Sequence, residues 1–349
     1  MAPNPYSSMP ARQFWRTGVA DPGPFGLEDL HRPRFGLSPR DRIMTVGSCF
    51  AQNISKALRR EGFNWLVTEP APPGLSAQSA KRFGYDVFTA RTGNVYTSAS
   101  MKQWVERALS NTDFDDEIWR EANGRFRDPL RPTVEPDGFA SEAELRTART
   151  RTFSALRTAF AEADVLILTL GLTEAWRHRD TRLLYQMCPG VQGGEFNREL
   201  HRHVNFRFDE VMADLEAVIH RLQAFNPTLR IILTISPQPL TATAEDMHAL
   251  VANAYTKSVL RAVAGEAAVC HERVDYFPSY EMLASPSMRG MFYGPNMRTV
   301  EPPGVDFVMS HFFRAYCGGE TAWRGTLQAG AERDEAECNE MILDFYNAS

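Results

Sequence analysis

Ile43-Met44-Thr45-Val46-Gly47-Ser48-Cys49-Phe50-Ala51 decides the fold class of this chain of 349 residues. Its apolar first half predicts a buried strand that ends at Gly47, where glycine allows a sharp turn into a helix over Phe50 to Glu61. Ser48 then lies at or near the helix N-terminus, where unpaired N–H groups and the helix dipole favour a developing oxyanion. The stretch therefore predicts an α/β sheet and a candidate catalytic hydroxyl, and a serine that only caps the helix is the simpler alternative.

The alternation of strand and helix continues along the chain. Three further apolar runs predict strands: Val165 to Leu170, Arg230 to Ile235 and Cys270 to Tyr276. Amphipathic patterns predict four more helices: Ser98 to Leu109, Ser141 to Ala163, Asp209 to Phe225 and Ala244 to Ala264. This order predicts a parallel sheet with helices on both faces. Active residues collect at the carboxyl ends of such strands, which carry Gly47-Ser48, Gly171 to Glu174, Ser236-Pro237 and Tyr276 to Pro278.

The composition argues against several classes of protein. The formal net charge is −5, and no stripe dense in Lys and Arg is present, so nothing points to nucleic acid. No apolar run reaches the ~18 residues of a membrane span, and the first residues lack the pattern of a secretory signal. The five cysteines are scattered without a C-x-x-C motif, which favours neither a disulfide framework nor a zinc ribbon. We expect a cytoplasmic protein.

The chain divides into three parts. Residues 1–38 are rich in Pro and Gly and predict an ordered arm that lies over the body. Residues 39–325 form the α/β domain, in which the polar and aromatic residues 111–140 are an insertion and a candidate lid. Residues 326–349 contain an acidic amphipathic helix, over Ala331 to Tyr346.

Five blocks of the sequence carry a resemblance to a known family. They are Gly47 to Ala51, Gly93 to Thr97, Thr169 to His178, Ser236 to Leu240 and Tyr276 to Glu281. With them the chain resembles the GSCFA family over roughly residues 38–315. That family resembles the SGNH (GDSL-like) hydrolases, which implies a flavodoxin-like three-layer α/β fold and a serine nucleophile. Members of the wider group are esterases, deacetylases and, less often, acyltransferases that act on carbohydrates or other polar scaffolds.

The resemblance assigns roles to residues of this chain. Ser48 takes the position of the nucleophile, and its own N–H and that of Gly93 take the positions of oxyanion donors, with Asn94 as a possible side-chain donor. Gly171 matches the glycine of the third block. Glu174, or Thr173 beside it, stands where a hydrolase has Asn.

The expected base is the point at which the chain departs from the wider group. That group carries Asp-x-x-His near its C-terminus, whereas this sequence has none and reads Asn296-Met297-Arg298-Thr299 in the corresponding place. Asp306 and His311 are the closest alternative pair, but a spacing of five places them on different faces of a helix. His178, four residues beyond Glu174, is a second candidate to line the pocket.

Three further side chains offer alternatives. Cys49 is a rival nucleophile, because a thiolate is also stabilised at a helix N-terminus, although packing under the turn is the better interpretation. His201 and His203 could reach over the site from a loop, and their spacing suits a metal, but no third ligand is apparent.

We therefore expect a serine esterase that hydrolyses an acyl ester, with acetyl favoured, of a glycan or another polar small molecule. His311, or failing it His178, would move the proton, and no metal or organic cofactor is required. One alternative is an O-acyltransferase in polysaccharide or glycolipid synthesis on the same scaffold. The other is a binding protein that has lost the Asp-x-x-His pair.

Overall fold

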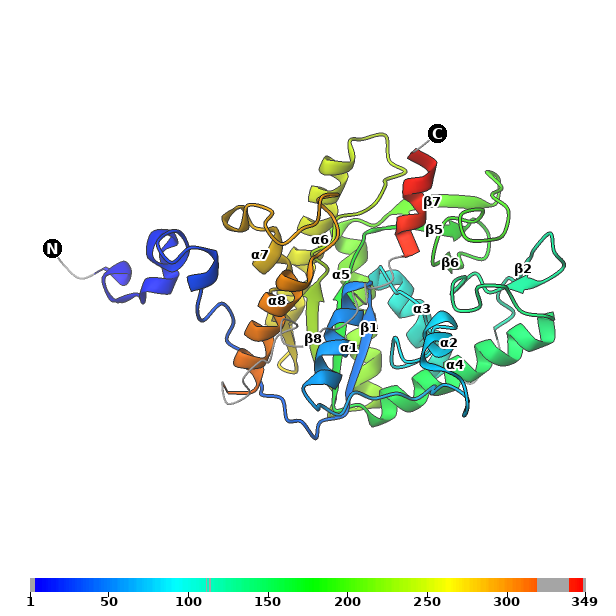
Figure 1. Cartoon of the computed structure of the whole chain (residues 1–349), viewed down its shortest axis with the longest axis horizontal. Coiled ribbons are helices and arrows are strands. Elements are labelled where there is room, and N and C mark those ends of the chain that lie inside the picture. The colour runs from blue at the N-terminus through cyan, green and yellow to red at the C-terminus, as the bar shows by residue number, and fades with distance from the viewer. Residues whose placement is uncertain (1–3, 111, 113, 319–338, 348–349) are drawn as a thin grey trace.

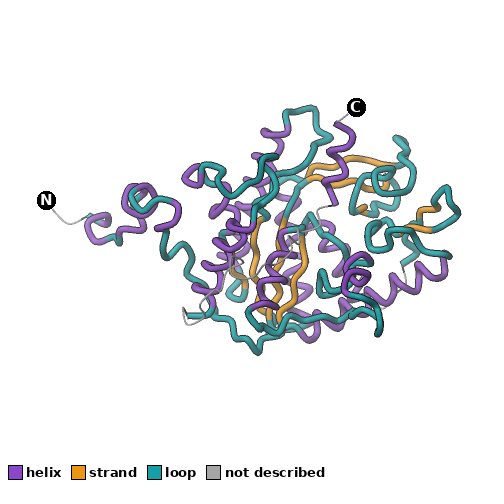
Figure 2. The backbone as a smooth tube through the Cα atoms, in the orientation of Figure 1, coloured by secondary structure: helices purple, strands orange, loops and turns teal. Residues whose placement is uncertain are grey.

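The core of the molecule is a parallel sheet of four strands in the order β1-β4-β8-β9. The structure is a computed structural model that describes residues 4–110, 112, 114–318 and 339–347. The strands are β1 (Ile43–Gly47), β4 (Val165–Leu170), β8 (Arg230–Ile235) and β9 (Val274–Phe277). Figures 1 and 2 show the sheet at the centre of the molecule with helices on both sides.

Two hydrophobic cores separate the layers. On one face of the sheet lie α3 (Ser98–Leu109), α4 (Glu142–Glu162), α5 (Phe208–Phe225) and α6 (Ala249–Cys270). On the other face lie α1 (Phe50–Arg60), α7 (Ser279–Ala284) and α8 (Pro302–Tyr316). Successive residues of β4 alternate between the cores: Leu166 and Leu168 enter the first, Val165 and Ile167 the second. The expected three-layer α/β fold is confirmed.

A short extended segment extends the sheet beyond β1. Ile43 forms a parallel bridge with Trp65, and the Leu66 N–H donates to the Ile43 carbonyl at 2.9 Å. The chain that follows α1 therefore lies on one side of β1, and β4 lies on the other. At such a switch point the connections leave the carboxyl ends of the two strands in opposite directions and open a crevice, where ligands bind in open α/β sheets. Ser48 lies at this point.

A second, antiparallel sheet follows β4 directly. It consists of β5 (Glu174–His178), β6 (Leu184–Tyr185) and β7 (His201–Asn205), in the order β6-β5-β7. The sequence pattern did not indicate this sheet, because β5 and β7 are rich in charged residues and histidine instead of apolar residues, and β6 has only 2 residues. The remaining short elements are α2 (Ala77–Arg82), η5 (Pro286–Met288) and the hairpin of β2 (Trp119–Arg120) and β3 (Phe126–Arg127) within the insertion.

One predicted boundary is wrong. We expected a helix from Ala244 to Ala264 and a strand from Cys270, whereas α6 begins at Ala249 and continues to Cys270. Gly265 follows the expected end, but one glycine costs only about 1 kcal/mol in a helix, and Ala267 and Ala268 are buried in the core. The strand β9 begins only at Val274.

The arm lies against the body over only part of its length. Residues 4–26 form short turns, η1 (Pro5–Ser8), η2 (Ala11–Gln13), η3 (Arg16–Ala20) and η4 (Pro24–Gly26), that stand away from the body in Figure 1. Trp15 is 68% exposed and Phe25 77% exposed, although the Phe25 ring packs edge-on against Phe292 of the body with a centroid distance of 6.3 Å. Leu27 and Leu37 are buried and belong to the second core.

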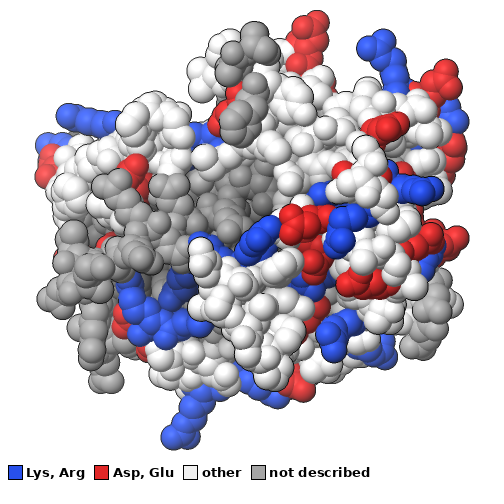
Figure 3. Space-filling model, turned by 45° about the vertical axis from the view of Figure 1, so that its right-hand side comes forward, with Lys and Arg blue, Asp and Glu red and all other residues white. Residues whose placement is uncertain are grey.

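The described C-terminal segment is η7 (Asn339–Asn347), and the rest of the expected helix over 326–349 lies outside the described residues. Within the described parts of the chain, no helix combines the length and the apolar character needed to cross a bilayer. Figure 3 shows one face of the molecule, on which basic and acidic side chains lie among one another.

A buried ionic network joins the insertion to α4. Asp128 is fully buried, and its carboxylate accepts from Arg131 Nε at 3.0 Å and from Arg149 Nη2 at 2.8 Å. Arg131 also donates to Thr152 Oγ1, which donates to a carboxylate oxygen of Glu69 at 2.8 Å. Burial opposes ionisation of Asp128, but the two guanidinium groups outweigh it and lower the pKa of this carboxyl group. The network holds the insertion as a fixed part of the domain.

Candidate functional site

The turn after β1 holds Ser48 in a closed environment. Gly47 has a φ of 144°, and a Cβ atom there would lie 2.3 Å from the carbonyl oxygen of Thr169, so only glycine fits between β1 and β4. Ser48 follows and is 2% exposed. Its Oγ atom is buried without a hydrogen-bond partner among the described residues. Cys49, rather than Ser48, occupies the N-cap position of α1, so the alternative that Ser48 only caps the helix does not hold.

The third sequence block lies against this turn. A Cβ atom on Gly171 would lie 3.0 Å from Ser48 Cβ and 3.4 Å from Tyr96 Cδ1, so the chain passes close to both side chains. The carbonyl of Gly171 accepts a hydrogen bond at 2.9 Å from the Nζ atom of Lys257, a buried lysine of α6. The sequence did not indicate a role for Lys257, because a single lysine in an amphipathic helix carries no local pattern.

One of the two expected backbone oxyanion donors, the Ser48 N–H, is already engaged, and so is the N–H of Gly171 in the third block. The Ser48 N–H donates to the Thr169 carbonyl at 3.0 Å, and the Gly171 N–H donates to the Tyr96 carbonyl at 2.9 Å. For the Gly93 N–H, in contrast, the described residues offer no hydrogen-bond acceptor. Of the expected backbone donors, Gly93 is therefore the one that remains available.

The segment that carries Gly93 is held next to Ser48. The Val95 N–H donates to the Gly47 carbonyl at 2.8 Å, and Asn94 Oδ1 accepts from Gln52 Nε2 of α1 at 3.2 Å. Gly93 has a φ of 65°, and a Cβ atom there would lie 2.5 Å from Gln186 Nε2, which donates to the Asn94 carbonyl at 2.7 Å. Gln186 thus fixes this turn, and the sequence analysis did not identify it.

Asp306 and His311 do not form a pair. Asp306 lies 3.5 Å from Arg60 of α1, whereas the His311 ring packs against Phe307 with a centroid distance of 4.7 Å. Both residues belong to α8, and five positions place them on different sides of the helix. Burial, with a smaller contribution from Arg314, lowers the pKa of His311 to about 4. The expected role of this pair in proton transfer finds no support in the geometry.

The loop in place of Asp-x-x-His lies beside the turn after β8. Asn296 Nδ2 donates to Thr299 Oγ1 at 2.9 Å, and Arg298 Nε donates to the Pro239 carbonyl at 3.0 Å. The neighbouring Gln238 accepts a hydrogen bond from the thiol of Cys49, next to Ser48. The loop therefore reaches the edge of the site, but an amide and a hydroxyl stand where an acid and an imidazole were expected, and neither titrates near neutral pH.

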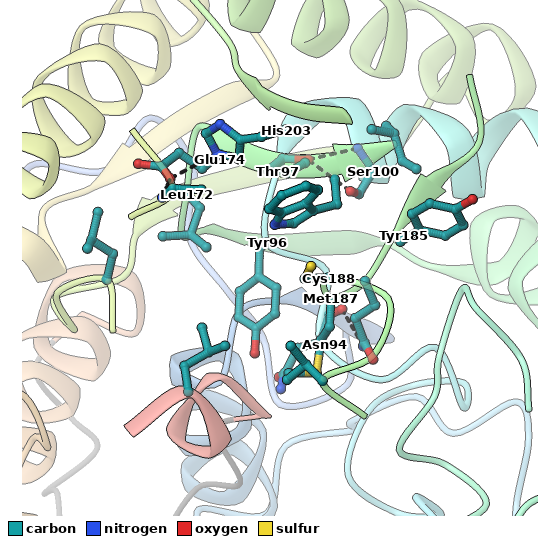
Figure 4. A pocket seen from close by; sticks show the side chains of 18 of the residues that line it. Asn94, Tyr96, Thr97, Ser100, Leu172, Glu174, Tyr185, Met187, Cys188 and His203 are labelled. Carbon is teal, nitrogen blue, oxygen red and sulfur yellow. Dashed lines mark hydrogen bonds and ion pairs between the residues drawn. The ribbon is translucent and has the colours of Figure 1, made fainter. Parts of the chain in front are cut away.

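A cavity of about 300 Å³ opens next to Ser48, which does not itself line it. Figure 4 shows Asn94 at one end of the cavity, Glu174 and His203 at the other, and Tyr96 between them. Aromatic and aliphatic side chains make up much of the wall: Tyr96, Trp104, Leu172, Trp176, Leu184 and Leu240. Leu130 is the contribution of the insertion, and Leu343 and Tyr346 of η7 also line the space. The arm contributes no residue to this wall.

Glu174 and His203 form a hydrogen-bonded pair across β5 and β7 of the second sheet. Glu174 Oε2 lies 3.1 Å from His203 Nε2, and Oε1 accepts from Thr243 Oγ1 at 2.8 Å. Burial raises the pKa of Glu174, but hydrogen bonds from His203, Thr243 and the Ala244 N–H outweigh it and leave the pKa lowered. Because both carboxylate oxygens are bound within the protein, Glu174 holds the loop around Thr243 in place. It is not an unengaged acid.

The other histidines lie away from Ser48. His178 Nδ1 accepts from the N–H groups of Asp180 and Thr181, so it closes a turn after β5 and does not line the cavity. In the described parts of the chain, one group has metal-ligand spacing: Glu216, His220 and His271, whose ligand atoms lie within 4.8 Å of one another. Glu216 bridges the two imidazoles of this group, on α5 and at the end of α6.

Comparison with known proteins identifies one family. The family model described as the GSCFA family matches residues 42–312, which span both the sheet and the candidate site. A search of the curated proteins gave no match.

Proposed function

The chain belongs to the GSCFA family, and on that premise we propose that it cleaves an acyl ester of a carbohydrate-like or other polar molecule, with Ser48 as the nucleophile. The proposal rests on one observation, the Ser48 hydroxyl that is buried without a hydrogen-bond partner among the described residues. An unpaired buried hydroxyl costs about 1–3 kcal/mol. If the Ser48 hydroxyl reacts with the carbonyl group of a substrate, this function explains why an unpaired hydroxyl is kept at a switch point of the sheet. We expect the reaction in the cytoplasm.

The proposed chemistry follows from the groups around the turn. Ser48 Oγ attacks the ester carbonyl, and the alcohol leaves as an acyl-enzyme forms. The Gly93 N–H donates to the developing oxyanion, because it is the expected donor without another partner. Water then hydrolyses the acyl-enzyme and regenerates Ser48. Since none of the described imidazoles bonds to Ser48, we expect slow turnover, because general base catalysis typically contributes 10²–10⁴-fold.

The first experiment compares the native protein with Ser48→Ala. It measures hydrolysis of p-nitrophenyl acetate and, separately, the intact mass after treatment with a fluorophosphonate. We expect slow release of p-nitrophenol and a single adduct, both of which disappear in Ser48→Ala. Cys49→Ala is the matched control, and it should retain both signals. If Cys49→Ala loses both signals and Ser48→Ala keeps them, the nucleophile is the Cys49 thiol and not Ser48.

A non-catalytic binding protein is the second candidate, and the loop of Asn296 and Thr299 favours it. Absence of both turnover and adduct would support this function, whereas an adduct without turnover would support an acyltransferase that lacks its acceptor. The double variant Asn296→Asp, Thr299→His restores the acid and the imidazole at their expected positions. If the remaining site is intact, we expect ester hydrolysis to rise by about 10²-fold or more. The single variant Asn296→Asp is the control and should stay at the native rate.

A further inference from the structure

We propose that the cavity beside Ser48 binds an extended apolar acyl chain, so that the ester carries a medium-length acyl group rather than acetyl. This inference rests on the proposed function, because it assigns the cavity to the acyl part of the ester that Ser48 would attack. Its test is chosen so that binding and turnover are measured separately.

The cavity lies one side chain away from the nucleophile. The ring of Tyr96 lines the cavity, and its Cδ1 atom lies 3.4 Å from the Cβ position of Gly171, which is itself 3.0 Å from Ser48 Cβ. Asn94 lines the cavity as well, and it follows the proposed oxyanion donor Gly93 directly. An ester carbonyl at Ser48 would therefore have its acyl chain at the wall formed by Tyr96, and a small movement of that ring would connect the two spaces.

The polar groups of the wall bond mostly to one another. Gln103 donates to the Leu184 carbonyl at 2.9 Å and accepts from the Leu184 N–H at 2.8 Å. Glu174 is held by His203 and Thr243, as described above. A hydroxyl-rich ligand would compete with these bonds, whereas a hydrocarbon chain leaves them intact and replaces water on apolar surface.

The polarity of the wall also sets the direction of the ligand. Gln186 Oε1 is buried without a partner, at the end of the cavity where the Gln186 amide packs on Gly93. The oxygens of an ester only accept, so Gln186 Oε1 would take its hydrogen bond from a hydroxyl of the polar alcohol part, which would lie at this end, near Ser48. At the opposite end, the Trp176 ring packs against His203 with a centroid distance of 5.4 Å and edge-on against Phe196 at 5.3 Å.

The volume of the cavity is too large for an acetyl group to fill it. The space of about 300 Å³ corresponds to roughly ten water-sized groups at ~30 Å³ each. It lies at the lower end of the range for small-molecule pockets. An acetyl methyl group would leave most of this space unfilled, whereas a chain of roughly eight carbons would occupy it. Leu343 and Tyr346 of η7 cover the chain from outside, and Tyr346 donates to the Gly190 carbonyl at 3.4 Å.

The test begins with binding to Ser48→Ala, which removes turnover. Methyl octanoate and methyl acetate are titrated separately and followed by calorimetry and by tryptophan fluorescence, since Trp104 and Trp176 line the cavity. We expect methyl octanoate to bind at least tenfold more tightly than methyl acetate. Equal affinities, or no binding of either ester, would overturn the proposal whatever the native protein does to esters.

Variants of the wall locate the binding. Leu240→Trp fills the cavity and should weaken methyl octanoate at least tenfold, whereas Leu250→Trp, at a position 71% exposed on α6, should leave affinity unchanged. Leu240→Ala enlarges the cavity, so it should move the preferred ester to a longer chain even if Leu240→Trp does not fold. A chain-length preference unaffected by Leu240→Ala would contradict the proposal. If methyl octanoate binds but the native protein does not hydrolyse it, the cavity is still an acyl-binding site, and only the esterase function is rejected.

Discussion

Two buried polar regions of this protein are built in opposite ways. In the network around Asp128, buried charges and a hydroxyl bond to one another, and a single nitrogen of Arg131 stays without a partner. At the turn after β1, the Ser48 hydroxyl has no partner, and the described residues provide no acceptor for the Gly93 N–H. Most polar groups that serve the fold are satisfied within the protein, whereas a group that binds a ligand must keep a donor or an acceptor unused. This difference separates the two regions without any assumption about the reaction.

The largest expected effect tests the structural region. Asp128→Ala leaves Arg131 and Arg149 buried without their counter-charge, and we expect a loss of about 3–5 kcal/mol in the free energy of unfolding. Urea denaturation measures this loss. Asp137→Ala is the control, because it removes an exposed ion pair with Arg82 and should cost less than about 1 kcal/mol. Equal effects of the two variants would contradict the structural role of the network.

The second prediction concerns the pH dependence of stability, and it treats His311 as a residue that serves the fold and not the reaction. The pKa of His311 is lowered to about 4 in the folded protein, against about 6.5 when unfolded. The unfolded chain therefore binds the extra proton between these values, so stability falls as pH drops from about 6.5 towards 4, by up to about 3 kcal/mol. His311→Leu should remove most of that slope in denaturation curves recorded across the range. His220→Gln, at an exposed position, should retain the slope.

Activity provides the complement to that experiment. If His311 has no part in proton transfer, His311→Leu should retain the ester hydrolysis of the native protein at pH 7. If a folded His311→Leu variant loses ester hydrolysis, His311 takes part in the reaction after all.

The third prediction compares two buried hydroxyls directly. Thr152→Val removes a hydroxyl that accepts from Arg131 and donates to Glu69, so we expect it to cost about 1–3 kcal/mol of unfolding free energy. The shape of the side chain is preserved, so the loss reports on the hydrogen bonds. A change within about 0.5 kcal/mol would show that the network is less tightly coupled than its distances indicate.

The smallest expected effect belongs to Ser48. Because its hydroxyl makes no hydrogen bond with the described residues, Ser48→Ala should leave stability within about 0.5 kcal/mol of the native value or raise it slightly. The same variant should abolish ester hydrolysis. A large loss of stability in Ser48→Ala would remove the contrast between the two regions, because Ser48 would then have a structural partner.

Local patterns predicted most of the central fold. The strands at Val165 and Arg230 have the predicted bounds, because continuous apolar runs of this length fit strands buried on both faces. The helix after Ser141 begins as predicted, with the Glu144 N–H donating to Ser141 Oγ at 3.1 Å. The antiparallel sheet could not be predicted in the same way, since β5 and β7 lack a continuous apolar run and meet only through the tertiary structure.

The site was predicted in part for the same reason. Ser48 and Gly93 lie in turns with strong local signals, and both are placed at the switch point. Gln186 and Lys257 meet that region from distant elements, and neither residue carries a local pattern. The roles of Asp306 and His311 depended on sequence spacing alone, and tertiary contacts with Arg60 and Phe307 determine where these side chains lie.

The position of η7 has a practical consequence for how the protein is handled. Leu343 and Tyr346 form part of the cavity wall, whereas the described part of the amino-terminal arm contributes no residue to it. An affinity tag or a biosensor linkage attached at the carboxyl end would pull on the cover of the cavity and change ligand affinity. Immobilisation through the amino-terminal arm leaves that cover undisturbed, so binding measured in the two orientations should differ.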